Sequence, residues 1–141
     1  MTIIFPSGGE ALEGEEELAW QVTDPDSPSH VFRVEYSPDG STTQHILATD
    51  IEETRIVANF DDLPGCSNGC VIRVLASDGV NTGIGISHNF NVPSKVPSAE
   101  ILFPGDGTTF QTQQLVWLQG HGFDPDDGFL TTYSIEPDTG I

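Results

Sequence analysis

The same short passage occurs twice in this 141-residue chain, about a hundred residues apart. The shared landmarks are Phe5-Pro6 and Phe103-Pro104, Trp20 and Trp117, and Asp24-Pro25-Asp26 and Asp124-Pro125-Asp126. Their offsets are 98, 97 and 100 residues. A repeat of this length has the size of one β-sheet domain, so we expect one whole domain followed by the first part of a second.

Short alternating segments separated by Gly, Pro, Asp and Asn predict β-strands throughout the chain. In the first domain the expected strands are 3–5, 18–22, 30–36, 45–48, 54–59, 70–76 and 85–92; in the second they are 99–103, 114–119 and 129–135. Seven strands in about 90 residues predict an all-β fold, a two-sheet Greek-key β-sandwich with Trp20 in its core. The acidic run 13–17 is interpreted as an exposed loop before the second strand.

The expected division is a complete sandwich over residues 1–92, a linker over 93–98 and the N-terminal half of a second module over 99–141. Pro93 and Pro97 restrict the linker, which suits a semi-rigid join between modules. Half a sandwich leaves apolar side chains and strand edges uncovered. We therefore expect residues 99–141 to be poorly ordered, to rest on the first domain, or to associate with another copy.

The chain is strongly acidic, with 22 Asp and Glu against 4 Lys and Arg and a formal net charge of −18. A field of this sign repels nucleic acid and anionic lipid, so neither is expected as a partner. No apolar stretch approaches the ~18 residues that a spanning helix needs. Solubility, adaptation to high salt and binding of divalent cations are the three interpretations of the charge. No signal peptide is recognisable at the start, so an export signal is expected upstream of this sequence.

Cys66 and Cys70 are the two cysteines, separated by Ser-Asn-Gly. A pair at this spacing in a turn is expected to close a small disulfide ring, which suits an oxidising compartment. The alternative is two reduced thiols. A zinc site is disfavoured because no second Cys or His pair stands at ligand spacing.

Residues 60–79 resemble a turn and strand of fibronectin type III and related bacterial Ig-like modules. The turn is Leu63-Pro64-Gly65, and the strand is Ile72-Arg73-Val74-Leu75-Ala76. In that family a Tyr usually stands six residues before the position of Ala76, where this chain has Cys70. The resemblance implies that Trp20 is the second-strand tryptophan and that the Cys66–Cys70 ring replaces the tyrosine as the anchor of the loop.

Calcium is the one metal that the pattern of carboxylates favours. Asp24 and Asp26 follow the second strand, and Asp78 lies between the last two strands; in a sandwich these loops share one end. A second cluster is expected at the join between modules, from Asp39, Asp61, Asp62, Asp124, Asp126 and Asp127. The alternative is ordinary turn chemistry, because Asp before Pro or Gly commonly forms turns.

No nucleophile, metalloprotease or phosphate-binding motif is present, so no enzymatic activity is expected. An exposed aromatic platform for carbohydrate would draw on Tyr36, Phe123, Phe129 and Tyr133, but alternation places Tyr36 in phase with core residues. We therefore expect a non-catalytic structural, spacer or adhesion module of a larger surface or secreted protein, beside neighbouring modules. The alternatives are a glycan- or protein-binding module and an accessory domain of a secreted hydrolase or peptidase.

Overall fold

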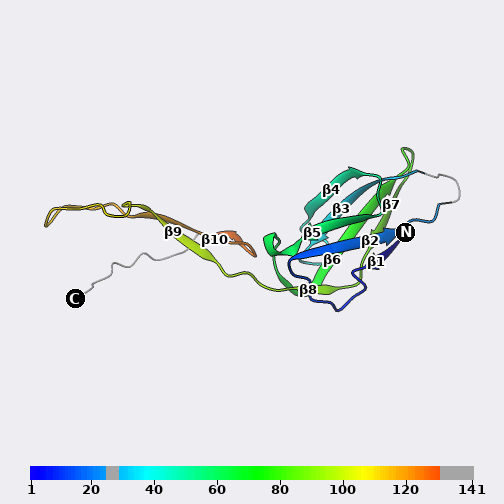
Figure 1. Cartoon of the computed structure of the whole chain (residues 1–141), viewed down its shortest axis with the longest axis horizontal. Coiled ribbons are helices and arrows are strands. Elements are labelled where there is room, and N and C mark those ends of the chain that lie inside the picture. The colour runs from blue at the N-terminus through cyan, green and yellow to red at the C-terminus, as the bar shows by residue number, and fades with distance from the viewer. Residues whose placement is uncertain (25–28, 131–141) are drawn as a thin grey trace. The chain divides into compact units, whose positions relative to one another are not determined.

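The computed structural model describes residues 1–24 and 29–130, and its elements are β-strands together with one short 3-10 helix (Figure 1). The chain divides into two compact units, Met1–Ser94 and Lys95–Ile141, here called unit 1 and unit 2. Asp26, Tyr133 and most of the strand expected over 129–135 lie outside the described residues. Among the described residues there is no helix that could cross a lipid bilayer.

One sheet of unit 1 has the antiparallel order β1-β2-β5. Its strands are β1 (Thr2–Phe5), β2 (Glu15–Gln21) and β5 (Arg55–Asn59). The expectation of a loop over 13–17 is wrong for its last three residues, which pair with β5 from Glu15↔Asn59 onward. Strand pairing satisfies the backbone of this acidic segment, while Glu15 and Glu17 remain exposed to water.

The other sheet has the order β4-β3-β6-β7. Its strands are β3 (Val31–Ser37), β4 (His45–Ile51), β6 (Cys66–Ser77) and β7 (Thr82–Ile86). The 3-10 helix η1 (Phe60–Asp62) connects β5 towards β6. Strands β3 and β6 pair over seven residues and form the middle of the sheet.

The strand expected over 85–92 is divided in two. β7 pairs with the second half of β6, and β8 (Phe90–Val92) pairs with the first half. Ser87 interrupts the strand: its hydroxyl accepts a hydrogen bond from the Ile72 amide at 2.9 Å. Alternation over 85–92 predicts that Ile86, His88, Phe90 and Val92 lie on one side. This prediction is wrong, because Ile86 at the end of β7 is exposed whereas Phe90 at the start of β8 is buried.

The core of unit 1 lies between the inner sides of the two sheets. Trp20 of β2 meets Phe32 of β3 edge to face, with ring centroids 5.4 Å apart. Tyr36, Phe60 and Phe90 form a second aromatic group, with centroids 5.9 to 6.2 Å apart. Trp20 is 2% exposed, which confirms its predicted place in the core. Unit 1 is thus an all-β, antiparallel fold compatible with a β-sandwich.

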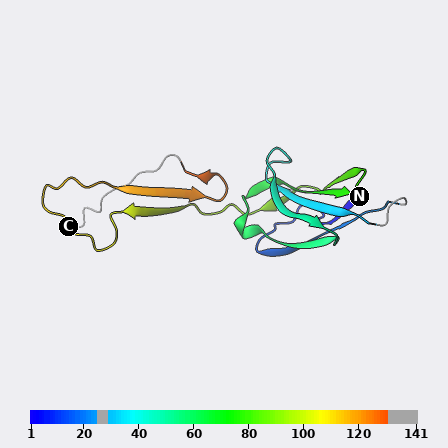
Figure 2. The ribbon, with the colours of Figure 1, turned by 90° about the horizontal axis from the view of Figure 1, so that it is seen from above.

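Unit 2 contains, among its described residues, one sheet of order β11-β10-β9 (Figure 2). Its strands are β9 (Ser98–Phe103), β10 (Gln119–Asp124) and β11 (Gly128–Phe129). The strand expected over 114–119 is therefore wrong in all but its last residue. The turn at Asp124–Gly128 places β10 against β11, and hairpin turns determine strand register.

The two copies of the repeat adopt different pairings. In unit 1 Ile3 pairs with Trp20, whereas the equivalent Ile101 of unit 2 pairs with Gly120 rather than with Trp117. Both Phe-Pro bonds are cis. Trp117 is 77% exposed, in contrast to Trp20, because the described part of unit 2 has no second sheet to bury it.

Candidate functional site

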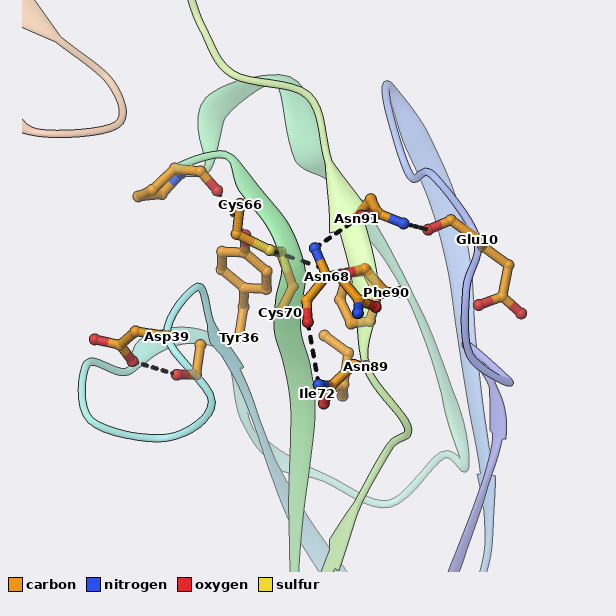
Figure 3. The surroundings of a disulfide bond; sticks show 12 residues. Glu10, Tyr36, Asp39, Cys66, Asn68, Cys70, Ile72, Asn89, Phe90 and Asn91 are labelled. Carbon is orange, nitrogen blue, oxygen red and sulfur yellow. Dashed lines mark hydrogen bonds between the residues drawn. A yellow bond between two sulfur atoms is a disulfide. The ribbon is translucent and has the colours of Figure 1, made fainter.

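A disulfide ring lies at the start of β6 (Figure 3). The sulfur atoms of Cys66 and Cys70 are at disulfide-bonding distance, and their Cα atoms are 5.9 Å apart. The segment is an irregularity within the strand rather than the turn that we expected, since both cysteines pair with β8. Asn68 has a φ of 55°, a left-handed conformation that Asn tolerates better than most residues.

Tyr36 of β3 anchors the loop that enters β6. Its hydroxyl donates a hydrogen bond to the carbonyl oxygen of Pro64 at 2.5 Å and lies 3.1 Å from Sγ of Cys70. The predicted replacement of the tyrosine by the ring is thus incomplete, because a tyrosine from the neighbouring strand also holds the loop. Alternation placed Tyr36 in the core, and its complete burial confirms this, but nothing in the spacing links it to Pro64.

Three asparagines connect the ring to β8 and to the N-terminal segment (Figure 3). Asn68 N–H donates to Oδ1 of Asn91 at 2.8 Å, and Asn89 Nδ2 donates to the Asn68 carbonyl at 3.1 Å. Asn91 Nδ2 in turn donates to the carbonyl oxygen of Glu10 at 3.3 Å. These contacts join segments that are distant in sequence, so sequence analysis did not find them.

The N-terminal segment 9–12 runs parallel to β8, with a bridge between Ala11 and Asn91. Three backbone hydrogen bonds join the two segments, at 2.8, 2.8 and 2.9 Å. They run from Gly9 N–H to the Asn89 carbonyl, from Asn91 N–H to the Glu10 carbonyl, and from Leu12 N–H to the Asn91 carbonyl. Segment 9–12, which follows β1, and β8, the last strand of unit 1, are therefore hydrogen-bonded side by side.

Glu10 shapes this segment through its carboxylate. Oε1 accepts from the Ser7 hydroxyl and from the Ser7 amide, and Oε2 accepts from the Gly8 amide at 2.7 Å. These donors, the Ser7 hydroxyl foremost, favour the ionised form and lower the pKa of Glu10 to about 2.

Two of the aspartates predicted to share one end of the sandwich line one pocket of about 250 Å³. Asp24 and Asp78 lie there together with His30 and Asn81. Asp24 Oδ2 is 3.2 Å from His30 Nε2. Asp26, the third predicted ligand, lies outside the described residues.

Asp78 also closes its own turn. Its Oδ1 accepts hydrogen bonds from the amides of Asn81 at 2.6 Å and Val80 at 2.8 Å. These amides, that of Asn81 foremost, lower the pKa of Asp78 below its usual value. Side-chain acceptance from amides two and three residues ahead is the usual turn chemistry of Asp.

Asp39, Asp61 and Asp62 are engaged by nearby groups of unit 1. Asp39 accepts from the amide and hydroxyl of Thr43, which together with Ser37 and Thr42 lower its pKa well below the usual range. Asp61 accepts from the Gly14 amide at 2.9 Å, and Asp62 accepts from Asn59 Nδ2.

The aspartates of unit 2 occupy the turn between β10 and β11. Asp124 Oδ1 accepts from the Asp126 amide, and the Asp127 amide donates to the Asp124 carbonyl. Asp126 Oδ2 accepts from the Lys95 amide at 2.9 Å, which ties this turn to the start of unit 2. Residues 1–24 and 29–130 contain no group of three or more His, Cys, Asp or Glu side chains arranged to hold a metal ion.

Of the candidate aromatic platform, strand register places Phe123 of β10 opposite Phe129 of β11. Tyr36 is buried, Phe123 is partly exposed on β10, and Tyr133 lies outside the described residues. No family model, curated protein or solved structure matches this chain. Its function therefore has to be argued from its own residues.

Proposed function

We propose that this chain is a non-catalytic, load-bearing spacer or adhesion module of a larger extracellular or cell-surface protein. The observation that carries the proposal is the parallel pairing of segment 9–12 with β8. Tension applied through the two ends of unit 1 pulls parallel neighbours in opposite directions along their length. All three backbone hydrogen bonds are then loaded together instead of being opened one by one.

The packing around this pairing supports the same role. The Asn91 side chain forms hydrogen bonds with β6, at Asn68, and with segment 9–12, at Glu10. The disulfide ring and Tyr36 hold the start of β6 beside β8. A spacer transmits distance and force only if its terminal strands stay in place. These contacts are concentrated where segment 9–12 meets β8.

Membership of the fibronectin type III or Ig-like class is part of the proposal. The pairings β2–β5 and β3–β6 join strands that are not consecutive, as Greek-key connections require. A buried Trp20 between two antiparallel sheets also agrees with that class. The extracellular location is supported by the disulfide, because such bonds persist in oxidising compartments.

The test is single-molecule pulling of the full chain from its two ends. We expect Asn91→Ala to speed unfolding of unit 1 under load by about 5- to 30-fold, the effect of losing one or two kcal/mol of bonding. Asn81→Ala is the matched control, because it removes the same side chain from a turn outside the paired segments. Equal effects of the two variants on the unfolding rate would overturn the load-bearing role.

Association between copies through unit 2 is a further part of the proposal. Leu115 and Trp117 are 81% and 77% exposed, and Ile101, Leu102 and Phe103 are also exposed. Exposed large apolar side chains that gather in one unit support an interaction site there. Calcium binding at the pocket lined by Asp24 and Asp78 is a second candidate function, favoured by the presence of both carboxylates in its lining.

A further inference from the structure

Two of the four basic residues in the sequence stand on the outward side of the sheet β4-β3-β6-β7. Strand register places Ile46, Glu35, Arg73 and Ile86 in one row, and Arg33, Leu75 and Ile84 in the next. We call these seven residues the arginine face. Glu35 is 4% exposed and lies 2.8 Å from Arg33 Nε and 3.2 Å from Arg73 Nη1.

The arginine face combines this charge with exposed apolar surface. Ile46, Ile84 and Ile86 are each more than half exposed, at 56%, 54% and 55%. A hollow of about 360 Å³ opens on the same side, lined by Arg33 and Leu75 among others, with Asp50 also in its wall. Such a surface suits a partner that offers apolar side chains and carboxylates together.

The outward side of the sheet β1-β2-β5 has the opposite character. Glu15 and Glu17 alternate along β2, and Val57 of β5 lies opposite Glu17. Ile4 and Val57 are 56% and 63% exposed. Arg55 lies 3.7 Å from Glu17, so two acids and one base stand on this side. We call Ile4, Glu15, Glu17, Arg55 and Val57 the glutamate face.

We infer that the arginine face of one copy binds the glutamate face of a second copy of this chain. Charge favours this orientation, because two copies with a net charge of −18 repel each other over most of their surfaces. The contact brings Arg33, whose side chain is 47% exposed, to acidic side chains and covers isoleucines with Ile4 and Val57. Because the contact joins two different faces, a pair still has one free arginine face and one free glutamate face. Further copies can therefore add to the pair.

The size of the faces makes each contact weak. Four strands spaced about 4.8 Å apart, with five residues of about 3.3 Å each, cover roughly 300 Å². Stable interfaces bury about 800 Å² on each partner. We therefore expect association in the range of high micromolar to millimolar concentration, strengthened when modules are joined or crowded at a surface.

The experiment is sedimentation equilibrium of the full chain up to about 1 mM at about 0.15 M salt, where charge repulsion is screened beyond roughly 8 Å. We expect Ile84→Glu, on the arginine face, to weaken self-association at least about fivefold. Val80→Glu, in the same hairpin but on neither face, should weaken it by less than about twofold. Glu17→Lys and its control Glu53→Lys form the corresponding pair for the glutamate face.

Mixing the two face variants distinguishes the orientation. Ile84→Glu keeps its glutamate face and Glu17→Lys keeps its arginine face, so an equal mixture should regain wild-type affinity but stop at pairs. Circular dichroism melts check folding, and Ile46→Glu replaces Ile84→Glu if the latter does not fold. Any association through unit 2 is common to all variants and cancels in the comparison.

Three results would overturn the inference. They are the absence of wild-type association at 1 mM, equal effects of a face variant and its control, and no recovery of affinity in the mixture. The last result would point to an identical-face dimer or to a different acidic partner.

Discussion

At the scale of single residues, burial determines how much an ion pair contributes to the free energy of unfolding. Glu35 and Glu17 both pair with arginines on neighbouring strands, one on each sheet of unit 1. Glu35 has a 5% exposed side chain, whereas Glu17 and Arg55 are mostly exposed. A buried charge that loses its partner is costly, while an exposed pair contributes little.

We therefore expect Glu35→Gln to lower the free energy of unfolding of unit 1 by about 2 kcal/mol, because Arg73 is left with its charge largely buried. Glu17→Gln, the matched control, should change it by less than about 0.5 kcal/mol. Urea denaturation followed by circular dichroism measures both values. Similar losses in the two variants would contradict the assignment of Glu35 as a buried ion-pair partner.

At the scale of strands, the two tryptophans show whether the equivalent segment of each repeat is packed against another sheet. Trp20 lies between two sheets, and Trp117 lies outside any strand of the described residues. Each tryptophan follows an apolar pair, Leu18-Ala19 and Leu115-Val116, and their difference in exposure comes from the strands that face them.

Acrylamide quenching tests this difference in variants that keep one tryptophan each. We expect the fluorescence of Trp117, measured in Trp20→Phe, to be quenched several-fold more strongly than that of Trp20, measured in Trp117→Phe, because quencher reaches only an exposed ring. The samples are kept dilute. Protection of Trp117 that grows with protein concentration would be the signature of the proposed association through unit 2, whereas equal protection in dilute samples would contradict its exposure.

At the scale of the whole molecule, calcium would act as a ligand of the folded state. The calcium hypothesis predicts that excess calcium raises the Tm of the chain above its value with chelator at fixed ionic strength, since a ligand that binds only the folded state stabilises it. Magnesium controls for general screening of the net charge. Asp78→Asn should remove the shift, and Asp39→Asn should retain it; superimposed melts would instead assign these carboxylates to turn chemistry.

The inner faces of the strands were predictable from the sequence. Alternation placed Trp20 and Tyr36 in the core because strand side chains point to opposite sides in turn. Asp24 and Asp78, from loops that the sequence analysis placed at one end of the first domain, line one pocket. The break at Ser87 was not predictable, because its hydroxyl replaces a backbone partner that only the paired strand reveals.

The sequence by itself determined that the chain is all-β and that the strands of its first domain alternate between core and solvent. These properties depend on neighbours along the chain. Only the tertiary structure decided the division of 85–92, the anchoring of Pro64 by Tyr36, the pairing of segment 9–12 with β8 and the register of β10. Each of these depends on which distant backbone groups and apolar surfaces meet, and the shared Leu-x-Trp pattern occurs at a buried tryptophan, Trp20, and at an exposed one, Trp117.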